Sequence, residues 1–160
     1  MENAITLASD IPVMHTPTGG WHGDMPEPVL ARCNEPLVPG APDLRGTWRV
    51  VGVERGGQAA PADDPVYGHI QRIEQAGNRL VVTAGHIIHD MVVDGTEDNG
   101  VHDVAEFDLK TPIVVVATYE DGVHVLRPVG FPIEVTRRLD GEHMIWQYLD
   151  FVARLERIHS

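Results

Sequence analysis

The chain of 160 residues has a single cysteine, few aromatic residues and no long hydrophobic run. One cysteine, Cys33, excludes an internal disulfide and a metal site built from thiolates. Cys33 also lies far in sequence from any obvious base, which argues against a nucleophilic role. A bilayer span needs about 18 consecutive apolar residues, and the sequence has no such run. Because the N-terminus also lacks a basic cluster followed by an apolar stretch, we expect a cytoplasmic protein.

Positive charge is scarce as well. Twelve Lys and Arg residues stand against 24 Asp and Glu residues, which gives a net charge of −12. A field of this sign repels phosphate backbones and anionic lipid headgroups, so we expect neither nucleic acid nor a membrane as a partner. The sequence also has no P-loop, no dinucleotide-binding glycine pattern and no serine elbow, and we therefore expect no cofactor.

The length fits one domain, with an unusual first quarter. Residues 1–43 hold seven of the twelve prolines and little periodicity, which predicts an irregular extension. This segment also contains many apolar residues, so we expect it to wrap the barrel or cover an open end, anchored by Trp21 and the Val29–Leu30 pair. A flexible extension with one docked patch is the alternative. Residues 44–160 form the predicted barrel domain.

From residue 44 onward, apolar and polar residues alternate with the period of a β-strand. Asn-Gly and Asp-Gly pairs, such as Asp121-Gly122 and Asp140-Gly141, separate the segments and are typical of tight hairpins. The pattern predicts an all-β, antiparallel up-and-down barrel of eight to ten strands. The first strand contains Trp48, Val50 and Gly52 on one face, and the others are expected at about 68–75, 79–84, 86–93, 101–108, 112–119, 123–128, 132–138, 142–149 and 151–158.

The two ends of this region carry a family resemblance. The first strand opens with Gly46-Thr47-Trp48, and the last reads Ala153-Arg154-Leu155-Glu156-Arg157-Ile158. These segments resemble the calycins, meaning the lipocalins, fatty-acid-binding proteins and nitrobindin-like barrels. The resemblance implies a barrel in which Trp48 packs near an arginine of the last strand. It implies that Arg154 faces the interior with Glu156 on the same face, in a role that is structural or that holds a ligand carboxylate.

Two members of that group differ from this sequence in informative ways. Fatty-acid-binding proteins carry a helical lid after the first strand, and residues 56–67 are too short and too rich in proline to supply one. Nitrobindin-like barrels bind haem through a histidine four residues before the matching arginine, where this chain has Asp150. The nearest histidine is His143, so the resemblance does not extend to haem binding.

Alternation also selects candidate catalytic residues. In the 101–108 segment, Asp103 shares the apolar face with Phe107, and in the 86–91 segment His89 shares the more apolar face with Ile87 and Met91. An inward carboxylate and an inward imidazole suit acid–base catalysis. The alternative is that both side chains only satisfy polar partners at the barrel rim. His86 points away from His89 on a strand, so we predict no metal site unless Gly85 forms a bulge.

Further polar and apolar residues complete the predicted site. Tyr119 and Tyr148 are candidate hydrogen-bond donors, and Arg127, on the face opposite His124, suits a developing negative charge on oxygen. The predicted catalytic set is therefore Asp103, His89, Tyr119, Tyr148 and Arg127. The predicted ligand-binding set is Trp48, Val50, Ile87, Met91, Phe107, Trp146 and Arg154.

These residues favour a cofactor-independent enzyme that isomerises, cyclises or opens a small, mostly apolar molecule such as a terpenoid or polyketide intermediate. One alternative is a carrier that holds a small hydrophobic ligand without reaction, and another is a haem-binding barrel. The sequence leaves homodimer formation open.

Overall fold

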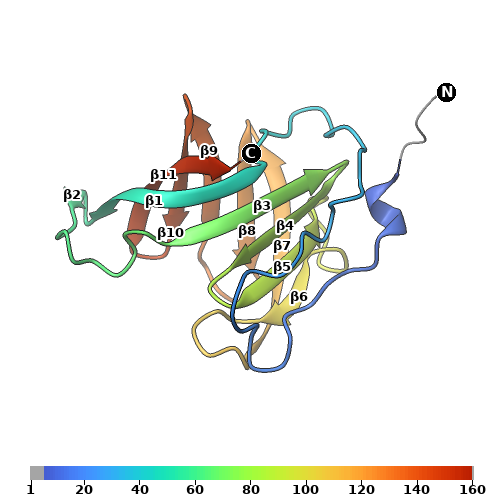
Figure 1. Ribbon diagram of the computed structural model, residues 1–160, viewed down its shortest axis with the longest axis horizontal. Helices are drawn as coiled ribbons and strands as arrows, with labels where there is room; N and C mark the ends of the chain where they lie inside the picture. The colour runs from blue at the N-terminus through green and yellow to red at the C-terminus, as the bar shows by residue number, and fades with distance from the viewer. Residues whose placement is uncertain (1–5, 160) are drawn as a thin grey trace.

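Strands form where the alternating segments predict them, and they make one antiparallel sheet (Figure 1). The computed structural model describes residues 6–159. A short 3-10 helix, η1 (Ala8–Asp10), precedes the strands. The strands are β1 (Gly46–Arg55), β2 (Gln58–Ala59), β3 (Ile70–Ala76), β4 (Arg79–Ala84), β5 (Ile87–Val92), β6 (Val101–Val104), β7 (Pro112–Glu120), β8 (Val123–Pro128), β9 (Val135–Asp140), β10 (His143–Tyr148) and β11 (Phe151–His159).

The first long strand pairs with the last, as barrel closure requires. The sheet order is β5, β4, β3, β1, β11, β10, β9, β8, β7, β6, with the short β2 attached to β1. The strands β5 and β6 end this order and meet along a seam, so the barrel is nearly closed. The predicted all-β, up-and-down architecture is confirmed. Within the described part of the chain, no helix is long and apolar enough to cross a membrane.

A bulge changes the face alternation of β1. The register between β1 and β11 shifts between Val50 and Gly52, after which Val53 is buried in the core. The expectation that Gly52 continues the face of Trp48 and Val50 is therefore wrong, because one extra residue in a strand moves every later side chain to the other face.

The strand β6 is shorter than predicted. It ends at Val104, and residues 105–111 form a turn in which the Ala105 N–H donates to the Thr111 carbonyl over 2.8 Å. Leu109 has a φ of 58° in this turn, which a strand does not allow. The prediction of a strand over 101–108 is wrong in its second half, and Phe107 consequently lies in the turn with 80% of its surface exposed.

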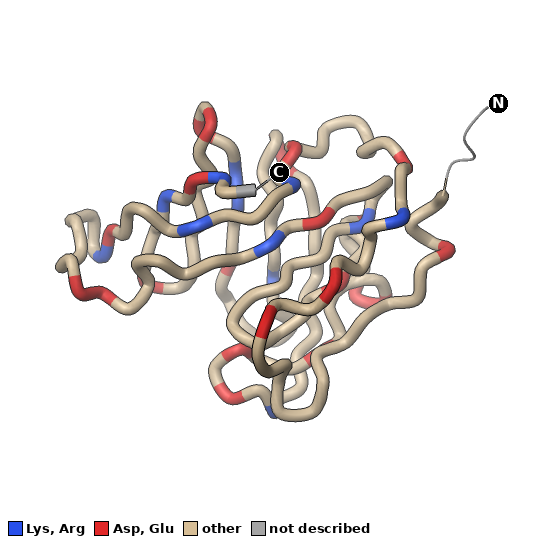
Figure 2. The backbone as a smooth tube through the Cα atoms, viewed as in Figure 1, with Lys and Arg blue, Asp and Glu red and all other residues tan. Residues whose placement is uncertain are grey.

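The N-terminal segment, residues 6–42, lies as a strap against the outer wall of the barrel, crossing β5 and β6 in the view of Figure 1. A second apolar cluster joins Trp21, Val29 and Leu30 of the strap to Val81 of β4 and Ile88 of β5. Strands β4 and β5 are buried on both faces as a result. Many of the acidic residues lie in this strap and in the turns between strands (Figure 2).

A fully paired arginine holds the strap. The buried guanidinium of Arg79, on β4, forms a two-point ion pair with Asp90 of β5, with distances of 2.8 and 2.5 Å. It also donates to the carbonyl oxygens of Ala8, Ile11 and Pro12 in the strap. All of its charge is thus balanced by groups that the fold supplies, which makes Arg79 a structural residue.

Thr16 of the strap bridges the seam between β5 and β6. Its hydroxyl accepts the N–H of Ile88 over 2.9 Å, and its own backbone N–H donates to Oδ2 of Asp103 over 2.8 Å. The ring nitrogen Nε2 of His89 lies 3.0 Å from the carbonyl oxygen of Val104. The strap and these side chains therefore connect the two strands at which the sheet order ends.

The end of the barrel that holds the start of β1 is closed by a tryptophan. Trp48 is fully buried, its indole N–H donates to the Leu44 carbonyl over 2.9 Å, and the guanidinium carbon of Arg157 lies 4.3 Å from its ring centroid. The expected contact of this tryptophan with a last-strand arginine is present, but the arginine is Arg157. The residue four positions before Arg157 is Ala153, which has no group to bind haem iron.

The expectation that Arg154 and Glu156 face the interior is wrong. Arg154 forms an exposed ion pair with Asp140 at 2.7 Å, and Glu156 forms another with Arg49 at 2.5 Å. The buried residues Ala153 and Leu155 of β11 point inward, so Arg154 and Glu156, which alternate with them along the strand, point outward.

Candidate functional site

A cavity of about 320 Å³ occupies the barrel interior at the end opposite the buried tryptophan. Its wall is mostly apolar, and its mouth lies between the β4–β5 turn and the loops 105–111, 129–134 and 149–150. The apolar lining includes Val82, Ala84, Ile87, Val115, Leu126 and Val135. Its polar lining includes His69, Gln71, His89, Glu106, Arg137 and Tyr148.

The charged group deepest in this wall is Arg137 of β9. Its residue surface is 5% exposed, its Nε donates to Oε1 of Gln71 over 2.8 Å, and its guanidinium carbon lies 5.5 Å from the Trp146 ring centroid. Burial lowers the pKa of Arg137 to about 10, so the group still carries its charge at neutral pH. Among residues 6–159, no carboxylate forms an ion pair with it, and Nη1 is buried without a hydrogen-bond partner.

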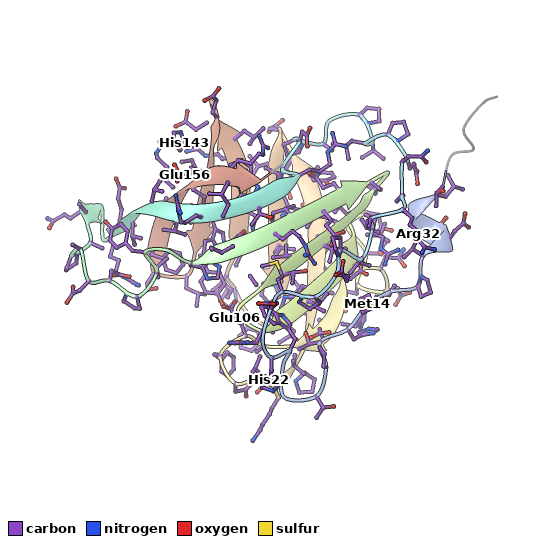
Figure 3. The ribbon with its side chains drawn as sticks, in the orientation of Figure 1. Met14, His22, Arg32, Glu106, His143 and Glu156 are labelled. Carbon is purple, nitrogen blue, oxygen red and sulfur yellow. The ribbon has the colours of Figure 1, made fainter. Side chains whose placement is uncertain are left out.

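Glu106 brings a carboxyl group to the same cavity, from the turn that follows β6. Burial raises the pKa of Glu106, and the positive charge of Arg137 only partly offsets this effect. Gly85, with a φ of 54°, makes room for the carboxyl, because a Cβ at that position would collide with Oε1 of Glu106. Figure 3 places Glu106 at the same end of the barrel as His22 of the strap.

Neutral aromatic side chains surround these two groups. His69 stacks on Trp146 with 5.1 Å between ring centroids, and burial lowers the pKa of His69 to about 4. Burial also raises the pKa of the Tyr148 phenol, which therefore stays protonated. His124 is fully buried beside Tyr119, and burial lowers its pKa to about 3. At neutral pH, these histidines are uncharged because burial disfavours the charged form, and the positive charge of Arg137 disfavours it further.

Only one member of the predicted acid–base pair, His89, lines the cavity. His89 and Asp103 are close, with Nε2 and Oδ1 3.9 Å apart, and His89 lines the cavity as predicted. The Asp103 carboxylate, however, accepts the backbone N–H groups of Thr16 and Val104. The two residues thus satisfy partners at the seam, which is the alternative interpretation of their pattern, and their catalytic role stays a prediction.

The other predicted catalytic residues are divided between the cavity and the rest of the barrel. Tyr148 lines the cavity. Tyr119 lies farther inside, where its hydroxyl accepts Nε2 of Gln75 over 3.0 Å. His124 and Arg127 point to opposite faces as expected, with His124 inside. The expectation that Arg127 stabilises charge in the cavity does not fit its position, because it is exposed and paired with Glu120 and Glu134.

The predicted ligand-binding residues show a similar division. Ile87, Phe107 and Trp146 line the cavity. Trp48, Val50 and Met91 belong to the packed barrel core, and Arg154 lies outside on β11. The sequence reasoning missed Glu106, Arg137, His69 and Gln71. The sequence signal for Arg137 was its position two residues after the apolar Val135, which places both on the same face of a strand. The adjacent Arg138, however, made the segment resemble a solvent-exposed one.

A larger hollow of about 510 Å³ lies outside the barrel, between the strap and strands β4 and β5. Its buried charges, Arg79 and Asp90, are paired with each other and with the strap. In the described residues, no cluster of three or more His, Cys, Asp or Glu side chains is arranged to hold a metal ion. The interior cavity is therefore the stronger candidate site, because it contains a charge, that of Arg137, with no ion-pair partner in the described part of the chain.

Comparison with protein-family models and with curated proteins found no match to this sequence. The class of protein is accordingly defined by its architecture alone, a nearly closed antiparallel β-barrel with an interior cavity.

Proposed function

We propose that this protein is a cofactor-independent enzyme that transfers a proton within a small, mostly apolar molecule held in the barrel. One observation carries the proposal: a carboxyl group, Glu106, and an unpaired buried cation, Arg137, line the same apolar cavity. A carboxyl group with a raised pKa suits proton transfer near neutral pH, and a fixed cation stabilises negative charge that develops on oxygen.

In an isomerisation, each of these residues has a separate role. The ionised carboxylate of Glu106 removes a proton from the carbon next to a substrate carbonyl, and the electron pair of that bond moves to the carbonyl oxygen. Arg137 stabilises the resulting enolate, assisted by the neutral phenol of Tyr148. Glu106 then returns the proton to the same or a conjugated carbon. Because the wall is mostly apolar, it excludes water and strengthens the attraction between Arg137 and the enolate.

A carrier of a small hydrophobic ligand is the second candidate. It is favoured by the apolar mouth, where Phe107 and Phe131 are 80% and 62% exposed. A carrier needs only the apolar wall and one anchor, so it requires Arg137 but not Glu106. The two functions therefore differ in the consequence of changing Glu106.

The test is the exchange of the α-protons of 2-decanone for deuterium in buffered D₂O, followed by mass spectrometry. We expect the protein to accelerate exchange and Glu106→Gln to reduce the acceleration about 100-fold or more. Glu54→Gln, on the exposed outer face of β1, is the matched control and should exchange at the rate of the unchanged protein. Binding of the ketone without any acceleration by the unchanged protein would favour the carrier.

A further inference from the structure

Four buried nitrogen atoms in the residues that line the cavity have no hydrogen-bond partner within the described chain. They are Nε2 of His69, Nε2 of Gln71, Nη1 of Arg137 and Nε1 of Trp146. Buried polar atoms in folded proteins are nearly always hydrogen-bonded. Four of the nine unpaired ones in residues 6–159 belong to residues that line this cavity, where a bound molecule can supply the missing partner.

The chemistry of these atoms is one-sided. The Gln71 amide nitrogen, the Arg137 guanidinium and the Trp146 indole can only donate, and neutral His69 donates in its Nε2-protonated tautomer. The natural acceptor within the group, Oε1 of Gln71, is already occupied by Nε of Arg137. These four atoms therefore offer donors and one positive charge, and a molecule that bonds to them must supply acceptor oxygens.

The origin of these residues explains why they converge. Gln71 lies at the start of β3 and His69 directly precedes that strand, whereas Arg137 and Trp146 are directly opposed on the paired strands β9 and β10. The planar guanidinium and its planar neighbours favour a flat group with two oxygens over a single hydroxyl. This site also differs from the last-strand arginine that the calycin resemblance indicates, since Arg154 points away from the cavity.

The mouth determines where the rest of the ligand lies. The cavity has a volume of about 320 Å³. A ligand too long for it must extend between the exposed side chains at the opening, Phe107, Phe131 and Leu149. Their exposure beside a cavity is accounted for if the apolar part of the ligand covers them.

We infer that the substrate is an amphiphilic anion whose planar oxyanion, a carboxylate or the enolate of a 1,3-dicarbonyl, binds Arg137 and Gln71 while its apolar body lies toward the mouth. This inference rests on the proposed function for the location of the site, and it adds the chemical class of the ligand and its direction in the barrel.

Calorimetric titration with three probes of one chain length tests it. The probes are decanoate, decane-2,4-dione and decan-1-ol, and the variants are Arg137→Met and the control Arg127→Met, which removes an exposed arginine from the outer face of β8. In the unchanged protein and in Arg127→Met, decanoate should bind about tenfold or more tightly than decan-1-ol. In Arg137→Met, this preference should disappear while binding of decan-1-ol is retained.

The probe decane-2,4-dione distinguishes a site for enolates from a site for carboxylates. Accumulation of its enolate on the unchanged protein but not on Arg137→Met, followed by ultraviolet difference absorbance, would assign the site to enolates. Binding of decanoate without enolate accumulation would assign it to carboxylates.

Equal affinities for decanoate and decan-1-ol in the unchanged protein would overturn the inference and leave the apolar cavity and the proton transfer by Glu106 standing. A preference for decanoate that survives in Arg137→Met would also overturn it. Failure of all three probes to bind would contradict both the inference and the proposed function.

Discussion

The barrel has two buried arginines, Arg79 and Arg137, and their contacts predict which of them stabilises the fold. Arg79 is paired with Asp90 and with three strap carbonyls, whereas the Arg137 side chain has, among residues 6–159, one hydrogen bond, to Gln71, and the face of Trp146. Replacing each arginine with methionine retains an unbranched side chain and removes the charge. We expect the two replacements to change stability in different directions.

The expected magnitudes follow from the contacts. Burial lowers the pKa of Arg137 to about 10, well below its ordinary value, which corresponds to roughly 3 kcal/mol of unfavourable free energy in the folded state. Arg137→Met removes this penalty but also loses a hydrogen bond and a cation–π contact of about 1 kcal/mol each. The net result is a gain of about 1 kcal/mol, or roughly 2–4 °C in the melting temperature.

Arg79→Met should behave in the opposite way. It leaves Asp90 as an uncompensated buried charge and frees three strap carbonyls, which costs about 3–5 kcal/mol. Urea unfolding at pH 7, followed by tryptophan fluorescence, measures both variants against the unchanged protein. If Arg137→Met loses as much free energy of unfolding as Arg79→Met, then Arg137 is a structural residue and the reasoning about its unpaired charge is refuted.

Three further predictions concern the seam, the mouth and acid stability. Asp103→Asn should slow 2-decanone exchange by less than about twofold, because the carboxylate is engaged by Thr16 and Val104; a loss comparable to that in Glu106→Gln would restore Asp103 as the acid–base group. Gly85→Ala should displace the Glu106 carboxyl and reduce exchange while decanoate affinity, measured by calorimetry, is retained; unchanged exchange would contradict the placement of Glu106. Burial lowers the pKa of His124 to about 3, so between pH 6.5 and 3 the unfolded state binds a proton that the folded state does not bind. The free energy of unfolding should therefore fall by about 1.4 kcal/mol for each pH unit of acidification in this range. In urea titrations across the range, His124→Met should reduce that slope by the equivalent of one proton.

Most of the barrel could be predicted from local chemistry. Asp-Gly pairs such as Asp121-Gly122 and Asp140-Gly141 lie between consecutive strands, and strict alternation located those strands within a few residues. The deviations arise where tertiary contacts override alternation. The register shift after Val50 and the turn that follows Val104 depend on how each strand meets its neighbour, which a period of two does not encode.

The site was harder to predict for the same physical reason. The alternation that turned His89 inward was correct, but it could not show that Thr16, 87 residues before Asp103, occupies the carboxylate of Asp103. Nor could it show that Glu106, beyond the end of its strand, returns to the cavity over Gly85. The arginine that contacts Trp48 is Arg157 and not the predicted Arg154, because the pairing of β11 with β1 and β10 determines which of its side chains lie on each face.

The most direct test of the account follows the three indole N–H groups by NMR during a titration with decanoate. Trp146 lines the cavity with an unpaired indole nitrogen, Trp48 is buried at the closed end with its indole bonded to Leu44, and Trp21 lies in the strap. We predict that the Trp146 resonance moves and that the other two do not. A titration in which Trp146 stays fixed while the ligand binds would place the ligand elsewhere and contradict the central claim.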